Sequence, residues 1–274
     1  MGQPMSKPTN RSKARLMLGT CYFSLRRVLL WGRMRHIFAL KKSNDSLPFV
    51  YSSHRTPLLR ELKNTEMWMQ YNKIANLRLA AARVNGILLH PGEVFSYWRL
   101  IGKPSRLKGY QKGMILVNGT VRPGVGGGLC QLSNLIFWMT LHTPLTVVER
   151  HRHAYDVFPD SNRTQPFGSG ATCFYPYGDL MIRNDTQETY QLQIHVGEKD
   201  LIGEWRVSEA PEYRYEVVER NHEMCGEAWG GFTRHNELYQ QQYDLSDGTL
   251  LSERLIVKND AIMMYSPFLD QGKE

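Results

Sequence analysis

Apolar side chains recur at helical spacing in three segments of the chain, residues 16–31, 67–84 and 129–139. The middle segment has the clearest pattern, because its apolar positions lie three, four or seven residues apart, as on one face of a helix. These positions are Met67, Ile74, Leu77, Ala81 and Val84. Residues 64–66 supply capping side chains ahead of this helix, and Asn85-Gly86 predicts its end.

Short apolar runs separated by turn-forming residues predict β-strands in the rest of the chain. Asn118-Gly119 between two such runs predicts a hairpin, and a second hairpin is expected around residues 184–186. Together the helices and strands predict an α+β fold with a mixed or antiparallel sheet, in which a Gly-rich turn leads into a central helix. Strands are expected at residues 87–89, 94–98, 114–117, 120–121, 145–157, 171–175, 180–183, 190–196, 201–207, 213–219 and 250–257.

Charge divides the chain into two unequal parts. Residues 1–42 contain ten Lys or Arg and no acidic residue, whereas the other 232 residues carry 24 basic and 26 acidic residues. The formal net charge of +8 is therefore a property of the N-terminal segment. The length of 274 residues is near the upper limit for one core. We expect a basic helical segment at residues 1–46, a core domain at 47–208 and a β-rich extension at 209–274.

A basic helical segment of this kind predicts a polyanionic partner. We expect residues 11–42 to contact an anionic membrane surface, because the apolar run Leu16–Leu25 is too short to span a bilayer. Arg15, Arg26 and Arg33 would share one face of this helix. A helix that only packs on the core is the alternative. Nucleic acid is not expected as a partner, since no basic groove with interleaved aromatic residues continues into the core.

The four cysteines are separated by 109, 43 and 52 residues, so neither a zinc knuckle nor a redox pair is indicated. No small-residue cleavage site follows the first apolar run. These features predict reduced thiols and a cytoplasmic protein that is peripheral at the inner face of the membrane. The outer face of the membrane is the alternative location.

Cys130 lies in the first turn of a helix that follows a glycine-rich stretch. The positive end of the helix dipole and the free N–H groups of a first turn favour a thiolate over a thiol. The N–H groups of Gly126, Gly127, Gly128 and Gln131 are candidates to bind the oxyanion that forms when a thiolate attacks a carbonyl. The pattern indicates a nucleophile, with a core-filling cysteine or a metal ligand as alternatives.

Candidate acid–base groups lie in residues 148–153. Strand alternation would place Glu149, His151 and His153 on one face. We expect His153, or else His151, to act as the base for the cysteine, with Asp179 or Glu149 orienting the imidazole. Histidines that only bond the backbone are the alternative.

Arg150 and Arg152 occupy the opposite face and are candidates to receive an anionic substrate, with a solvated charged face as the alternative. His151, His153 and Cys130 together are a further alternative as metal ligands, although His-x-His alone is unspecific. No cofactor is expected, because the glycine run lacks the Lys-Ser/Thr ending of a phosphate-binding loop.

Four motifs and two C-terminal segments, taken together and in this order, resemble the VanW family over roughly residues 64–265. The four motifs are Pro91-Gly92-Glu93-x-Phe95-Ser96, Gly126-Gly127-Gly128-x-Cys130-Gln131-x-Ser133, Val148-Glu149-Arg150-x-x-His153 and Asp179-Leu180-x-x-Arg183-Asn184. The two segments are Gly230-Gly231-Phe232-Thr233-Arg234-His235 and Ala261-Ile262-Met263-Met264-Tyr265. The family pattern often has Ser after the second histidine, whereas Ala154 stands here and removes one hydroxyl from any proton network.

The resemblance implies an accessory role in resistance to glycopeptide antibiotics such as vancomycin, with peptidoglycan precursor or wall peptide as the partner. Its chemistry stays open between acyl transfer or hydrolysis by Cys130 and non-catalytic binding of wall peptide or glycan at the membrane face. A metal-dependent hydrolase is the third possibility.

Overall fold

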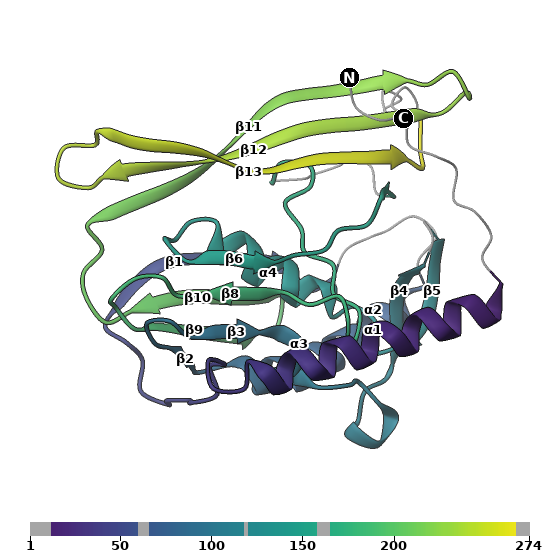
Figure 1. Ribbon diagram of the computed structural model, residues 1–274, viewed down its shortest axis with the longest axis horizontal. Helices are drawn as coiled ribbons and strands as arrows, with labels where there is room; N and C mark the ends of the chain where they lie inside the picture. The colour runs from purple at the N-terminus through teal and green to yellow at the C-terminus, as the bar shows by residue number, and fades with distance from the viewer. Residues whose placement is uncertain (1–11, 60–65, 118–119, 158–164, 267–274) are drawn as a thin grey trace.

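The computed structural model describes residues 12–59, 66–117, 120–157 and 165–266. Helices and short sheets form a core, three long C-terminal strands run along one side of it, and the first helix runs along the other (Figure 1). The α+β class is confirmed. No helix in the described parts of the chain is both long and apolar enough to cross a bilayer.

Four α-helices and one 3-10 helix lie in the described chain. They are α1 (Lys13–Arg33), α2 (Met67–Val84), α3 (Tyr97–Ile101), η1 (Arg106–Lys108) and α4 (Cys130–Thr140). Ser12 caps α1 by accepting the N–H of Arg15 at 3.3 Å. The hydroxyl of Ser96 caps α3 by accepting the N–H of Arg99 at 3.3 Å. Both caps satisfy a first-turn donor that the helix itself leaves unpaired.

The first sheet is antiparallel and packs against α2 and α4. Its order is β1 (Phe49–Pro57), β10 (Asp200–Val207), β9 (Tyr190–Val196) and β2 (Ile87–Leu89). Trp205 of β10 is fully buried, and its indole N–H donates to Oγ1 of Thr140 on α4 at 3.0 Å. The largest side chains buried in this core are aromatic, and burying a large apolar side chain contributes about 1.5–3 kcal/mol. The largest are Trp205, Tyr97, Tyr190, Phe95 and Phe137.

A second, small sheet and a hairpin complete the core. The sheet has the order β3 (Val94–Ser96), β8 (Met181–Arg183) and β6 (Thr146–Glu149). The hairpin joins β4 (Lys112–Val117) to β5 (Thr120–Val125) and packs on α2. Asn76 of α2 donates from Nδ2 to the carbonyls of Gln111 and Gly127, which fixes the turn after the hairpin.

The C-terminal strands form a third sheet with the order β11 (Tyr213–Gly226), β12 (Phe232–Asp244), β13 (Leu250–Met263) and β7 (Tyr155–Asp156). β7 pairs in parallel with β13 and ties this sheet to the preceding part of the chain. Gln240 of β12 adds a second link, because its Nε2 donates to the carbonyls of Leu141 and Thr143 at 2.7 and 3.1 Å. The expected boundaries at residues 46 and 208 stay a prediction.

The helices expected at residues 16–31, 67–84 and 129–139 are confirmed, with ends that agree to within three residues. The hairpin expected around residues 118–119 is also confirmed in its two strands, although the turn itself lies outside the described residues. The cap expected from residues 64–66 is wrong at Glu66, the one described residue of the three, whose side chain makes no capping bond.

Four expected β features are wrong. The strand expected at 145–157 ends at Glu149 and resumes only at β7, and residues 171–175 form one isolated bridge between Phe174 and Gly178. The strand expected at 94–98 ends at Ser96, because that side chain caps α3 instead. β8 and β9 do not form a hairpin, since they belong to different sheets. Strands β1 and β12 were not expected.

Candidate functional site

Glu149, the last residue of β6, is the centre of a cluster of polar groups. Its Oε1 lies 2.9 Å from Nε2 of His151 and accepts the backbone N–H of Asp179 at 3.0 Å. Arg27 of α1 donates from Nη1 to Oε2 at 2.8 Å and from Nη2 to Oε1 at 2.5 Å. Burial alone would raise the pKa of Glu149, but the bonds from His151 and Arg27 outweigh burial and lower it to about 2. Glu149 is therefore a carboxylate that only accepts, and Nε2 of His151 carries a proton.

Asp179 is completely buried and accepts three hydrogen bonds. The hydroxyl of Ser96 donates to its Oδ2 at 2.6 Å, and the N–H groups of Trp98 and Leu180 donate to its Oδ1 at 2.9 Å. Burial raises the pKa of Asp179 to about 6, although the bonds from Ser96 and Trp98 oppose this. Within the described chain no imidazole bonds to this carboxyl group. Of the two expected orienting residues, Glu149 contacts an imidazole, and Asp179 holds the start of α3.

Cys130 is the first residue of α4, directly after the turn Gly126–Leu129. Its sulfur lies 4.0 Å from the carbonyl oxygen of Cys173. Burial raises the pKa of Cys130 above its ordinary value, and backbone hydrogen bonds offset only part of this effect. This direction is opposite to the lowered pKa that the sequence predicts, because desolvation disfavours the thiolate. In the described chain no hydrogen bond joins this thiol to an imidazole, so its expected role as nucleophile stays a prediction.

The glycines of the turn before α4 allow backbone segments to pack closely. Gly126 and Gly128 have φ angles of 75° and 90°, and a side chain at Gly127 would collide with the backbone of Gly113. The N–H groups of these three glycines and of Gln131 donate within the chain. The acceptors are the carbonyl oxygens of Gln111, Gly124, Met114 and Gly128, at 3.0, 3.0, 2.8 and 3.1 Å. All four expected oxyanion donors are thus already engaged in this structure.

Arg150, an expected substrate-binding residue, holds a neighbouring loop instead. Its Nε donates to the carbonyl of Gly170 at 2.9 Å, and its Nη2 donates to the carbonyl of Gly168. The guanidinium also lies over the ring of Phe137, 4.7 Å from the centroid. Burial, together with the charge of Arg152, lowers the pKa of Arg150 to about 10. It remains a cation at neutral pH with these donors occupied.

The remaining residues expected in the site, Arg152, Gln131 and His153, lie in separate environments. The guanidinium of Arg152 lies 4.3 Å from the centroid of the Phe167 ring. Gln131 donates from Nε2 to Oγ1 of Thr56 at 2.9 Å, which ties α4 to β1. Burial and then the charge of Arg152 lower the pKa of His153. The structure therefore brings His151 and Glu149 together, and it does not join His153 to them by a hydrogen bond among the described residues.

A row of aromatic rings leads from α1 to His151, and sequence reasoning missed it. Ring centroids are 5.9 Å apart between Phe23 and Tyr177, 5.1 Å between Tyr177 and Phe174, and 5.3 Å between Phe174 and His151. Phe23, Phe174 and the His151 side chain are 46%, 38% and 38% exposed. We call Phe23, Tyr177, Phe174 and His151 the aromatic row. Its rings reach the surface beside the Glu149 cluster.

The loop that carries two rings of the aromatic row is fixed from both sides. Phe174 and Gly178 exchange two backbone hydrogen bonds of 2.9 Å, which closes the loop. Nη2 of Arg27 donates to the carbonyl of Tyr177 at 2.8 Å, and the indole of Trp98 donates to the carbonyl of Gly178 at 2.8 Å. The sequence Tyr175-Pro176-Tyr177-Gly178 was a usable signal, because Pro and Gly form surface turns that expose neighbouring aromatic side chains.

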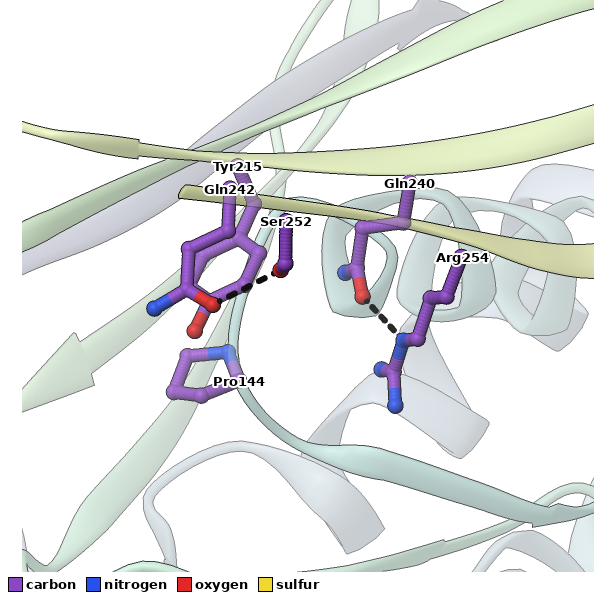
Figure 2. A pocket seen from close by; sticks show the side chains of 6 residues that line it. All are labelled: Pro144, Tyr215, Gln240, Gln242, Ser252 and Arg254. Carbon is purple, nitrogen blue, oxygen red and sulfur yellow. Dashed lines mark hydrogen bonds between the residues drawn. The ribbon is translucent and has the colours of Figure 1, made fainter. Parts of the chain in front are cut away.

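Two other kinds of site receive no support. Among the described residues, no three His, Cys, Asp or Glu side chains converge to hold a metal ion. A hollow of about 180 Å³ lies between Pro144 and the C-terminal sheet, where polar side chains bond to one another (Figure 2). The lining residues Gln240 and Arg254 are joined at 2.8 Å. The hollow is smaller than the few hundred Å³ typical of ligand pockets, and no expected site residue lines it.

Comparison with known proteins gives matches over most of the chain. The profile of the family described as VanW like protein matches residues 72–206, a range that contains every residue expected in the site. The vancomycin B-type resistance protein VanW of Enterococcus faecalis (strain ATCC 700802 / V583) is 32% identical over 243 residues, which are 88% of this chain and 88% of that protein. Uncharacterized protein YoaR of Bacillus subtilis (strain 168) is 35% identical over 82 residues, or 30% of this chain and 27% of that protein. No solved structure matches this chain significantly.

Proposed function

Because the chain belongs to the VanW family, we propose that it contributes to glycopeptide resistance by recognising peptidoglycan precursor or wall peptide. The observation that carries this proposal is the aromatic row, whose exposed rings end at an imidazole held by a carboxylate. Exposed aromatic rings bury a large apolar area when a ligand covers them, and the imidazole adds hydrogen-bonding capacity. The link to resistance is supported by the name of the relative that is similar over 88% of the chain.

Binding accounts for the geometry better than acyl transfer does. Burial raises the pKa of the Cys130 thiol, and the N–H groups expected to bind an oxyanion donate to carbonyls of the chain itself. An attacking thiolate needs a base within hydrogen-bond reach and free donors for the developing charge. The His151–Glu149 pair is bonded to Arg27 and Asp179 rather than to the sulfur.

Titration calorimetry with a soluble muropeptide, a disaccharide that carries the stem peptide, tests this proposal. Phe174→Ala and Tyr177→Ala should each weaken the affinity about tenfold, which corresponds to about 1.4 kcal/mol. Trp229→Ala is the matched control, because Trp229 is 45% exposed and lies outside the aromatic row. Equal affinities for all four proteins, or no heat of binding with the wild type, would overturn the proposal.

The same mixtures distinguish recognition from catalysis. Mass spectrometry of the muropeptide should find it intact after incubation with the wild-type protein. A cleaved or transferred peptide that disappears with Cys130→Ser would replace recognition by a cysteine-dependent reaction.

A further inference from the structure

The side of α1 that faces away from the core is apolar and exposed. Leu18, Tyr22, Leu25 and Leu29 follow one another at three- and four-residue spacing, and each is more than 60% exposed. Met17 and Val28, 66% and 56% exposed, extend the same side. We call these six residues the α1 apolar face. A group of six neighbouring exposed apolar side chains indicates that this surface contacts another apolar phase.

The opposite side of α1 is anchored, so the helix cannot rotate to bury its apolar face against the core. Arg27 is 7% exposed and makes its bidentate pair with Glu149 on that side. Leu30, Trp31 and Met34 pack there against a small cluster formed by Phe38, Val94 and Met181. These contacts fix the rotation of the helix about its axis, and the apolar face points outward as a result.

A row of cations borders the α1 apolar face. Arg15, Arg26 and Arg33 are exposed, and each lies three or four residues from Leu18, Tyr22 or Leu29 along the helix. Within the described chain no carboxylate pairs with any of the three, and residues 1–42 contain no acidic residue at all. Long cationic side chains at the edge of an apolar face can place their stems in an apolar phase and their charges among phosphate groups.

A second element presents the same chemistry. Leu107, in the middle of η1, is 101% exposed, and the adjacent Arg106 and Lys108 are exposed cations. Backbone bonds from Lys108 and Tyr110 to the carbonyl of Ser105 hold this turn in shape. Figure 1 shows the loop between α3 and β4 projecting on the side of the core where α1 lies, away from the β11–β13 sheet. A fully exposed leucine between two cations matches the α1 apolar face and its border.

We propose that the α1 apolar face and the η1 loop together form a docking surface for an anionic lipid bilayer. Both elements combine exposed apolar side chains, which enter the headgroup region, with unpaired cations, which attract anionic lipids. Charge complementarity selects a lipid surface, because a partner protein of ordinary composition does not supply phosphate groups along a whole helix. The inner face of the membrane stays the expected side. This proposal does not rest on the proposed function, since plain vesicles contain no wall component.

Co-sedimentation of the full chain with vesicles tests the proposal. The protein should bind vesicles of phosphatidylglycerol and phosphatidylcholine, and it should bind phosphatidylcholine vesicles only weakly. Raising the salt concentration from about 0.1 M to about 1 M should release it, because exposed charges are then screened over about 3 Å. Each of Arg15→Gln, Arg26→Gln and Arg33→Gln should lower the partition coefficient about fivefold.

Substitutions of single leucines examine the two elements separately. Leu25→Glu and Leu107→Glu should each lower the partition coefficient about tenfold or more. Leu250→Glu is the matched control, because Leu250 is 47% exposed on β13, in the sheet on the other side of the core. All three positions are exposed, and circular dichroism should find each variant folded.

Three results would overturn the proposal. The first is no binding to anionic vesicles. The second is a Leu107→Glu variant that binds like Leu250→Glu, which would remove the η1 loop from the surface. The third is a wild-type dimer in solution that Leu25→Glu converts to a monomer, because the α1 apolar face would then be an interface between two copies of the chain.

Discussion

Nη1 of Arg27 lies 2.8 Å from Oε2 of Glu149, a residue 122 positions further along the chain. The pair joins α1 to the end of β6, and the same carboxylate accepts from His151 and from the backbone of Asp179. The orientation of the first helix and the position of His151 therefore depend on one carboxylate. A substitution of Arg27 or Glu149 should therefore change both the free energy of unfolding and the position of His151 in the aromatic row.

Arg27→Gln should destabilise the fold by about 3 kcal/mol, because it leaves a largely buried carboxylate without its charged partner. Arg26→Gln is the control, since Arg26 is the exposed neighbour and surface substitutions change stability by about 0.5 kcal/mol or less. Urea unfolding followed by circular dichroism measures both. Equal free energies of unfolding for the two variants would mean that the pair contributes nothing. The double variant with Glu149→Gln should lose less than the sum of the two single changes.

Asp179 should make stability depend on pH in a recognisable direction. Its pKa is raised from 3.8 to about 6, so ionisation costs more in the folded than in the unfolded chain. The stability that it contributes is complete below its ordinary pKa and is lost as the pH rises through about 6. Between pH about 4 and about 7, the free energy of unfolding of the wild type relative to Asp179→Asn should fall by on the order of 3 kcal/mol. If the difference in free energy of unfolding between the wild type and Asp179→Asn did not change with pH, the raised pKa of Asp179 would be contradicted.

The Cys130 thiol should react slowly with iodoacetamide at neutral pH. Burial raises its pKa and limits access, whereas Cys21 and Cys225 are exposed. Variants that keep one cysteine each allow the alkylation rates to be measured separately against pH. We expect Cys130 to be slower than Cys21 at every pH and to react measurably only above its ordinary pKa. Rapid alkylation below pH about 7 would restore the thiolate nucleophile that the sequence predicts.

Gly127→Ala should destabilise the fold by more than about 2 kcal/mol, because its Cβ would collide with the backbone of Gly113 and Met114. Gly19→Ala is the opposite case. Within the part of the chain that the structure describes, no atom lies within 4 Å of a Cβ at that helical position, so the variant should gain about 0.5–1 kcal/mol. Thermal unfolding of the two variants should show a lower Tm for Gly127→Ala and a higher Tm for Gly19→Ala than for the wild type. Equal shifts in Tm would show that the glycine-rich turn is not needed for close packing.

Local periodicity was enough to predict the three long helices α1, α2 and α4, but not the short helices α3 and η1. The spacing of Met67 to Val84 and the mostly apolar residues 129–139 are visible without any contact partner, and α2 and α4 lie there. β12 carried no such signal. Its buried positions are largely polar, as with Asn236 and Gln240, and they are satisfied by bonds to distant carbonyls such as those of Phe167 and Leu141. A strand whose inward side is polar does not alternate in hydropathy.

The site was predictable only in part, because some of its contacts join residues that are distant in the sequence. Glu149 and His151 are two residues apart, and their contact follows from the chain itself. Arg27 and Tyr177 reach this cluster from positions that are more than a hundred residues apart, and nothing in either local sequence indicates the other. The expected strand through His153 ends at Glu149, and the next residue, Arg150, bonds to the loop at residues 168–170. Strand alternation therefore does not place His151 and His153 on one face with Glu149.

Nuclear magnetic resonance of the aromatic side chains during a muropeptide titration tests most directly whether wall peptide is recognised at the aromatic row. We predict that the ring signals of His151, Phe174 and Tyr177 shift together and saturate with the calorimetric affinity, while the indole signal of Trp229 stays in place. Saturable shifts elsewhere on the protein, with the signals of the aromatic row unchanged, would contradict the account.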